Sequence, residues 1–168
     1  ESSGTLTVGG QDPSKAGIFG MSKLVGTVLQ DTDGQFIGLT VAEDIAFVLE
    51  NDCMAQEEMF RKVDGVAETV EVKELLSHAP SEMSGGQKQR VAIASAIASD
   101  KPVIVFDEPT SGLDYRHMKK VAENLRELSS LGKTLFIVTH DPELIAECCN
   151  YFVFIENGKV LWSDGWNR

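Results

Sequence analysis

The sequence predicts an α/β protein with a mostly parallel sheet and a run of helices inserted into it. Two fully apolar segments, 103–106 and 135–138, are typical of parallel strands buried on both faces. The residues between them have the spacing of an amphipathic helix, and a strand, a helix and a strand in this order form a right-handed parallel crossover. We expect an α/β core from residues 1–39 and 88–168 and a helical subdomain from residues 40–87.

The composition is that of one globular domain without a nucleic-acid surface. The chain has 168 residues, 42% of them hydrophobic and 24% charged, and its formal net charge is −11. An acidic chain without a stripe of Lys or Arg is unsuited to a phosphate backbone, so we expect no nucleic-acid partner. No apolar stretch approaches the roughly 20 residues that a membrane-spanning helix needs. The first residues lack the basic and apolar stretches of a signal peptide, which predicts a cytoplasmic protein.

Strand and turn patterns organise the beginning of the chain. Residues 5–8 favour a strand, and residues 24–29 favour a second strand, which Gln30 follows directly. A turn-rich segment comes next. Thr40, with Glu43 three residues later, has the pattern of a capping box, so we expect a helix to begin there.

Helical periodicity marks two amphipathic helices further along the chain. In both, apolar residues recur at steps of three and four, which places them on one face of a helix. The first set is Met59, Val63, Val66 and Val70, and the second is Met118, Val121, Leu125 and Leu128. The chain then continues with a helix that Asp141 caps before Pro142, and with a hairpin around Asn157-Gly158.

Two carboxylates follow the first apolar strand. Asp107 and Glu108 come directly after residues 103–106, at the carboxyl end of the strand, where ligands bind in sheets of this kind. Asp107 is suited to hold Mg²⁺, directly or through water, and Glu108 is suited to polarise a water that attacks a terminal phosphate. An Asp-Glu pair after a strand is also common as a helix cap, so these two residues alone leave both interpretations open.

A glycine-rich helix start precedes the same strand. In Met83-Ser84-Gly85-Gly86-Gln87, Ser84 is suited to cap the helical run 88–99, and the two glycines leave backbone amides unshielded. The amide end of a helix carries a partial positive charge and binds anions without a basic side chain. An ordinary glycine turn before a helix is the alternative, and this motif alone does not exclude it.

Taken together, these motifs resemble those of the ATP-binding subunits of ABC transporters. Residues 83–87 match the signature motif of that family, Leu-Ser-Gly-Gly-Gln, with Met83 in place of leucine. Ser111-Gly112-Leu113-Asp114 resembles the D-loop. His140 matches the switch histidine, and Gln30 resembles the glutamine of the Q-loop. The resemblance covers nearly the whole chain.

The resemblance implies a P-loop NTPase fold and the hydrolysis of ATP. It makes Asp107 and Gln30 ligands of Mg²⁺, and Glu108, His140 and Gln30 catalytic residues. It also implies a head-to-tail dimer, in which residues 84–87 of one ATPase close over ATP that a second ATPase subunit or domain holds. Transmembrane subunits are the remaining implied partners, which places the chain on the cytoplasmic face of a membrane.

The segment 30–51 narrows the resemblance. Residues 35–41, Gln-Phe-Ile-Gly-Leu-Thr-Val, make it most similar to the ATPases of energy-coupling-factor importers, which take up cobalt, nickel and vitamins. This similarity implies that the chain energises the import of a small solute. It does not identify the solute, because membrane or binding subunits make that choice in this family.

One motif of the family is not found in these residues, the phosphate-binding loop G-x-x-x-x-G-K-[ST] known as Walker A. The nearest approach is residues 9–16, where Ser14 replaces the second glycine and Ala16 replaces the hydroxyl residue. We interpret Lys15 as an exposed lysine in a turn, and the chain as an N-terminally truncated fragment that begins downstream of Walker A. Without the amides and the lysine of that loop, the 168-residue polypeptide is expected to bind ATP poorly and to hydrolyse it negligibly.

Two other classes of function stay open on the sequence alone. One is a non-transport ABC ATPase that acts on DNA or ribosomes, against which the acidic charge and the lack of a coiled-coil pattern argue. The other is a catalytically inactive binding or regulatory module, which the missing loop favours. The presence of Asp107, Glu108 and His140 favours a piece of an active enzyme instead.

Overall fold

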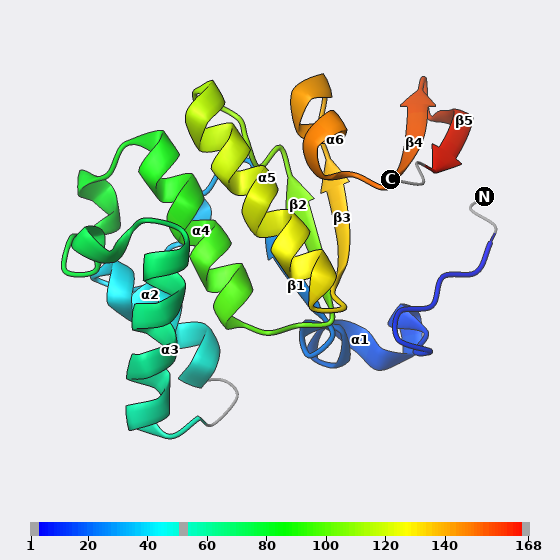
Figure 1. Cartoon of the computed structure of the whole chain (residues 1–168). Helices are drawn as coiled ribbons and strands as arrows, with labels where there is room; N and C mark the ends of the chain where they lie inside the picture. Colours follow the sequence, from blue (N-terminus) through cyan, green and yellow to red (C-terminus); the bar gives the residue numbers. More distant parts are fainter. Residues whose placement is uncertain (1–3, 51–53, 166–168) are drawn as a thin grey trace.

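The computed structural model describes residues 4–50 and 54–165, and these form an α/β fold around a three-stranded sheet (Figure 1). Both strand pairs are parallel, with Val28 beside Phe106 and Asp107 beside Val138. The predicted α/β class is therefore confirmed, together with the strands expected at residues 24–29, 103–106 and 135–138. The strands are β1 (Val25–Val28), β2 (Val103–Asp107) and β3 (Thr134–Val138), in the spatial order β1-β2-β3.

Helices cover one face of this sheet. In Figure 1, α4 (Gly85–Ala98) and α5 (Tyr115–Ser130) lie over the strands, and α2 (Val41–Glu50) and α3 (Gln56–Thr69) lie beyond α4. Ile104 and Phe106 of β2 are at most 1% exposed and belong to the hydrophobic core. The apolar faces predicted for α3 and α5 are buried in the same core. Burying one such side chain stabilises the fold by about 1.5–3 kcal/mol, so this layer holds the sheet and helices together.

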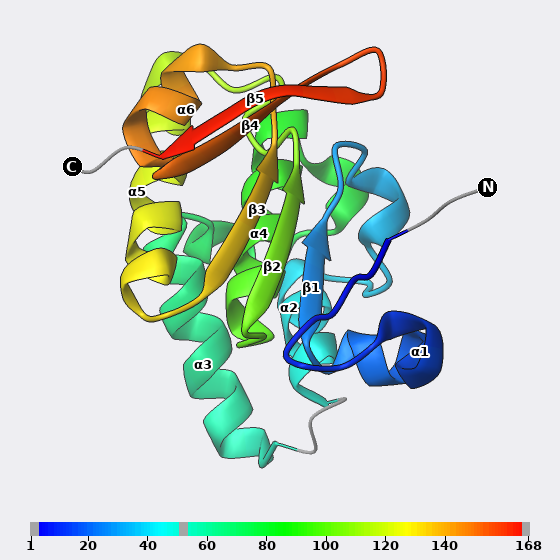
Figure 2. The same ribbon diagram turned by 90° about the vertical axis from the view of Figure 1, so that its right-hand side faces the viewer.

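The opposite face of the sheet is open at β3. Phe136 and Val138 are 60% and 58% exposed, and Figure 2 looks onto this side of the sheet. We predicted that β3 is buried on both faces, and this is wrong, because the described helices leave the face with Phe136 and Val138 uncovered. The same prediction holds only in part for β2, where Val103 and Val105 are half-buried. The accessible surface of 10415 Å² accordingly exceeds the about 8,100 Å² expected for a compact chain of 18.3 kDa.

Helical elements fill the chain between β1 and β2. The capping box predicted at Thr40 is confirmed, since Glu43 N donates to Thr40 Oγ1 at 3.3 Å and Thr40 N donates to Glu43 Oε2 at 3.2 Å. The buried residues of α2 and α3 belong to the same hydrophobic core as those of the sheet. α4 runs unbroken across residues 87 and 88, where we expected a domain boundary. Three short 3₁₀ helices complete the described residues of this part: η1 (Asp33–Gln35), η2 (Lys73–Leu75) and η3 (Pro80–Glu82).

The segment before β1 differs from the prediction. Residues 5–8 form no strand, and only Val8 makes a bridge, with Gln11. The backbone of this segment pairs with none of the described strands of the sheet, so it lacks the partner that a strand requires. Lys15 lies in the helix α1 (Pro13–Ser22) and not in a turn, because Asp12 caps that helix. Its side chain is 85% exposed, as expected.

The last elements agree with the prediction. Asp141 caps α6 (Pro142–Cys148), and its Oδ1 accepts a hydrogen bond from Glu143 N at 2.9 Å. A hairpin of β4 (Tyr151–Glu156) and β5 (Lys159–Gly165) follows. Its turn has positive φ at Asn157 (49°) and Gly158 (72°), as in the favoured two-residue hairpin turns. Within the described residues, no helix has the length and apolar character needed to cross a bilayer.

Gly38 lies where a side chain does not fit. A Cβ there would lie 2.7 Å from Asp44 N and 3.0 Å from Thr40 O, two backbone atoms at the start of α2. We expect Gly38→Ala to lower the free energy of unfolding by about 2 kcal/mol, because the start of α2 must move to admit a methyl group. Gly34→Ala is the matched control, since a Cβ at Gly34 meets nothing within 4 Å. Denaturant unfolding measures both, and equal stability of the two variants would contradict the expectation.

Candidate functional site

Polar side chains follow all three strands at the same edge of the sheet. β1 and β2 pair so that Val28 lies beside Phe106, and Gln30 and Glu108 each come two residues later. His140 follows the end of β3 in the same way. Because the strands are parallel, these three positions lie at the carboxyl edge of the sheet, where α/β proteins bind their ligands.

Glu108 and His140 are in direct contact. Glu108 Oε1 lies 2.7 Å from His140 Nδ1 and accepts a hydrogen bond from His140 N at 3.2 Å. Thr139 Oγ1 donates to the other carboxylate oxygen at 3.3 Å. A carboxylate only accepts hydrogen bonds, so Nδ1 carries a proton and Nε2 is the ring nitrogen left for a ligand. The side chain of His140 is 87% exposed, whereas that of Glu108 is 15% exposed.

This contact changes the ionisation of the histidine. Glu108 raises the pKa of His140, first through the side-chain hydrogen bond and then through the charge of the carboxylate, while desolvation acts in the opposite direction. A proton on His140 is therefore stabilised as long as Glu108 stays beside it.

The backbone of Glu108 is in the left-handed region, with φ of 48°. A residue with a Cβ pays about 1–2 kcal/mol there, and such strain is concentrated at functional sites. Two hydrogen bonds hold the bend, from Glu108 N to Val138 O at 2.8 Å and from Ser111 N to Glu108 O at 3.1 Å. The strand therefore ends at Asp107, and the next carboxylate turns towards the end of β3.

A pocket of 860 Å³ opens at the start of α4. Ser84 caps the helix as predicted, although the helix begins at Gly85 and not at Lys88. Gln87 Oε1 accepts from Ser84 N at 2.8 Å, so the glutamine side chain is part of a capping box. The pocket is lined by three segments: Gln30, Asp31 and Thr32 after β1; residues 84–90 of α4 and its cap; and Ser111, Gly112, Asp114 and His117 around the start of α5.

One segment joins this pocket to the Glu108–His140 pair. A Cβ at Gly86 would lie 3.0 Å from Leu113 Cδ2, so the loop before α5 packs directly against the first turn of α4. The same loop is tied to α6, because Thr110 Oγ1 donates to Asp141 Oδ2 at 3.1 Å. Residues 108–114 thus connect the carboxyl edge of β2 with the α4 pocket.

The structure brings most of the predicted site residues into two groups. Gln30, residues 84–87 and the loop 111–114 meet at the α4 pocket, and Glu108 meets His140. Asp107, at the end of β2, lines neither. Among the described residues, no cluster of three or more His, Cys, Asp or Glu side chains could hold a metal ion. One Asp and one Gln still fit Mg²⁺, which takes oxygen ligands and is held by one or two protein groups together with water and phosphate.

Sequence reasoning missed six residues that line the α4 pocket: Asp31, Thr32, Lys88, Gln89, Arg90 and His117. A signal for His117 was available, since Asp114 is an N-cap and a cap reaches the residue three positions later. Gln89 and Arg90 lie inside a helical run, and only the packing around α4 turns them towards the pocket. No sequence pattern gives that information.

The fold is that of an α/β class whose ligands bind at the carboxyl edge of the sheet, and a glycine-rich helix start of this kind is suited to an anion. The chain belongs to the ABC transporter family, whose sequence profile, described as "ABC transporter", matches residues 1–111. The resemblance to the ATP-binding subunits of ABC transporters, drawn from the motifs, is confirmed.

Curated relatives agree with this assignment. A putative ABC transporter ATP-binding protein of Streptococcus mutans is 42% identical over 169 residues, which cover 99% of this chain and 30% of the relative. One of Clostridium perfringens is 43% identical over 163 residues, covering 96% of this chain and 29% of the relative. The chain therefore spans about a third of the length of these relatives.

Solved structures have the same fold. The chain is similar to cbiO1 of Clostridium perfringens, part of the ABC transporter complex cbiONQ, with a TM-score of 0.84 and 29% identity over 98% of this chain and 66% of that one. It is also similar to the ATP-binding cassette MJ0796 in a dimeric post-hydrolysis state bound to ADP and Pi, with a TM-score of 0.83 and 26% identity over 94% of this chain and 71% of that one.

Replacing Glu108 is expected to change the titration of His140. Glu108→Gln removes the charge and the strongest acceptor, so the pKa of His140 should fall towards its ordinary value of 6.5. In the unchanged protein the folded pKa is the higher one, so this pair contributes stability below the unfolded pKa and loses it as pH rises through the folded pKa. Titration of the His140 ring by NMR measures the shift. An identical pKa in both proteins would show that Glu108 is not its cause.

The strained bend gives a second expectation. Glu108→Ala and Glu108→Gly both remove the carboxylate, but only glycine adopts φ of 48° without a steric cost. We expect the glycine variant to be more stable than the alanine variant by about 1 kcal/mol in denaturant unfolding. A more stable alanine variant would mean that the bend relaxes when the carboxylate is lost.

Proposed function

We propose that this chain carries part of the ATP-hydrolysing site of a transport ATPase. The observation that supports this most strongly is the contact between Glu108 and His140 at the carboxyl edge of the sheet. In this mechanism the terminal phosphate of ATP replaces the carboxylate beside His140. Glu108 then polarises the water that attacks the phosphate, and Gln30, beyond the neighbouring strand, helps to orient that water. Asp107 and Gln30 would hold Mg²⁺, which neutralises charge on the phosphate oxygens when bound.

The α4 pocket receives the terminal phosphates of a nucleotide held by a second ATPase subunit or domain. The unshielded amides of Gly85 and Gly86, at the positive end of a 14-residue helix, support this role. The dimeric state of MJ0796 with ADP and Pi supports a dimer here too. In a head-to-tail arrangement, residues 111–114 lie at the interface between the two ATPases. Within one chain they connect the α4 pocket, which closes one nucleotide site, to Glu108, which belongs to the other nucleotide site.

The energy of hydrolysis drives the import of a small solute through partner membrane subunits. The likeness to cbiO1, a part of the cbiONQ transporter complex, supports an ATPase of the energy-coupling-factor class, as does the segment 35–41. The chain then lies on the cytoplasmic face of the membrane as a peripheral subunit. The loop after Gln30 is the part that meets the membrane subunits.

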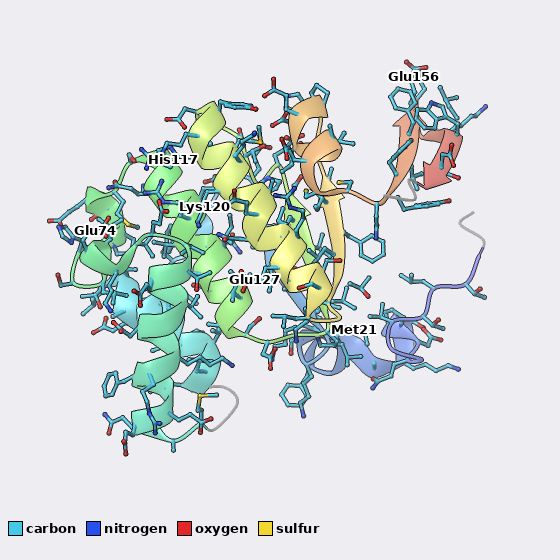
Figure 3. The ribbon with its side chains drawn as sticks, viewed as in Figure 1. Met21, Glu74, His117, Lys120, Glu127 and Glu156 are labelled. Atoms are coloured by element: carbon cyan, nitrogen blue, oxygen red, sulfur yellow. The ribbon has the colours of Figure 1, made fainter. Side chains whose placement is uncertain are left out.

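The decisive variant is Glu108→Gln in the complete polypeptide that carries these residues. We expect ATP turnover to fall by about 100-fold or more, because the amide cannot polarise the attacking water. Glu74→Gln is the matched control, since Glu74 is exposed and does not line the α4 pocket (Figure 3). Steady-state phosphate release measures turnover in the parent protein and in both variants. The 168-residue chain alone is expected to release negligible phosphate. Full turnover in Glu108→Gln would refute the assigned role.

A further inference from the structure

His117 lines the α4 pocket and has no role in the mechanism above. It lies in the first turn of α5, on the side that faces α4 (Figure 3). Its side chain is 35% exposed, which leaves part of the ring accessible from the pocket. A histidine in this position faces the amide end of α4, where an anion would bind.

Asp114 fixes the orientation of this ring. Asp114 Oδ1 accepts from His117 N at 2.9 Å and lies 2.8 Å from His117 Nδ1. These hydrogen bonds, the backbone one first, lower the pKa of Asp114, so the carboxylate is ionised and acts only as an acceptor. Nδ1 therefore carries a proton towards Asp114, and Nε2 is the nitrogen that a ligand can meet.

The same pocket contains buried donors that lack an acceptor. Gln89 is 3% exposed, and its Nε2 has no hydrogen-bond partner among the described residues. Arg90 Nε is buried without a partner in the same part of the chain. Both residues line the pocket. Leaving a buried donor unsatisfied costs about 1–3 kcal/mol, so the lining of the pocket is not fully satisfied by acceptors of the described residues.

We propose that His117 is a nucleotide-contacting residue of the α4 pocket, which donates a hydrogen bond from Nε2 to a phosphate oxygen. This inference rests on the proposed function, in which the pocket receives the phosphates of ATP. With a phosphate bound, Nδ1 donates to Asp114 and Nε2 donates to the phosphate oxygen. The other charged groups lining the pocket are Asp31, Lys88 and Arg90, so the ligand meets donors from both α4 and α5.

The test uses ATP-dependent association of the complete polypeptide in a Glu108→Gln background, which suppresses turnover. We expect His117→Ala to raise the ATP concentration for half-maximal association by about tenfold, the loss of one hydrogen bond to a charged group. For His117→Gln, which keeps a neutral donor, this concentration should lie between those of the parent and of His117→Ala. His78→Ala is the matched control, because His78 is exposed and lies outside the pocket; it should stay within about twofold of the parent.

Tripolyphosphate, as a competitor of ATP, distinguishes a phosphate contact from a contact to the sugar or base. If Nε2 contacts a phosphate, His117→Ala should weaken the binding of tripolyphosphate by the same factor as the binding of ATP. Unchanged tripolyphosphate affinity, or an association curve like that of His78→Ala, would overturn the inference and leave the proposed function standing. No association of the parent protein with ATP would overturn both.

Discussion

Parallel pairing of β1, β2 and β3 is the constraint on which the candidate site depends. The register places Val28 beside Phe106 and Asp107 beside Val138, so the chain leaves all three strands at one edge. Gln30, Glu108 and His140 lie at the same edge of the sheet for this reason. The core between the sheet and α4 and α5 holds the register, since a shifted strand would move Ile104 and Phe106 out of it.

The bend at Glu108 converts this edge into a site with two parts. Its left-handed backbone turns the carboxylate towards His140, while the residues that follow run to the first turn of α4. Residues 108–114 therefore contact both the carboxyl edge of the sheet and the first turn of α4. Leu113, which packs against Gly86 in the first turn of α4, lies within the same short loop as Glu108.

Local chemistry made much of the fold predictable. The capping pairs at Thr40, Ser84 and Asp141, the apolar strands and the Asn157-Gly158 turn all depend on residues close in sequence, and the structure has each of them. What depends on distant partners was not predictable. Residues 5–8 have strand composition but no described strand to pair with, and β3 has an apolar face that no described helix covers. The Asp114 cap points to His117 from the sequence, but the place of His117 in the pocket depends on α4 lying opposite.

We propose that Gln30, Asp107, Glu108 and His140 surround one triphosphate, which the α4 pocket of a second ATPase subunit or domain closes. A crystal structure of the complete polypeptide with a non-hydrolysable ATP analogue would reveal this site. We expect a terminal phosphate within hydrogen-bond distance of His140 and of the first amides of α4 from the second subunit or domain. A nucleotide bound elsewhere, with His140 still on Glu108 and the pocket empty, would contradict it.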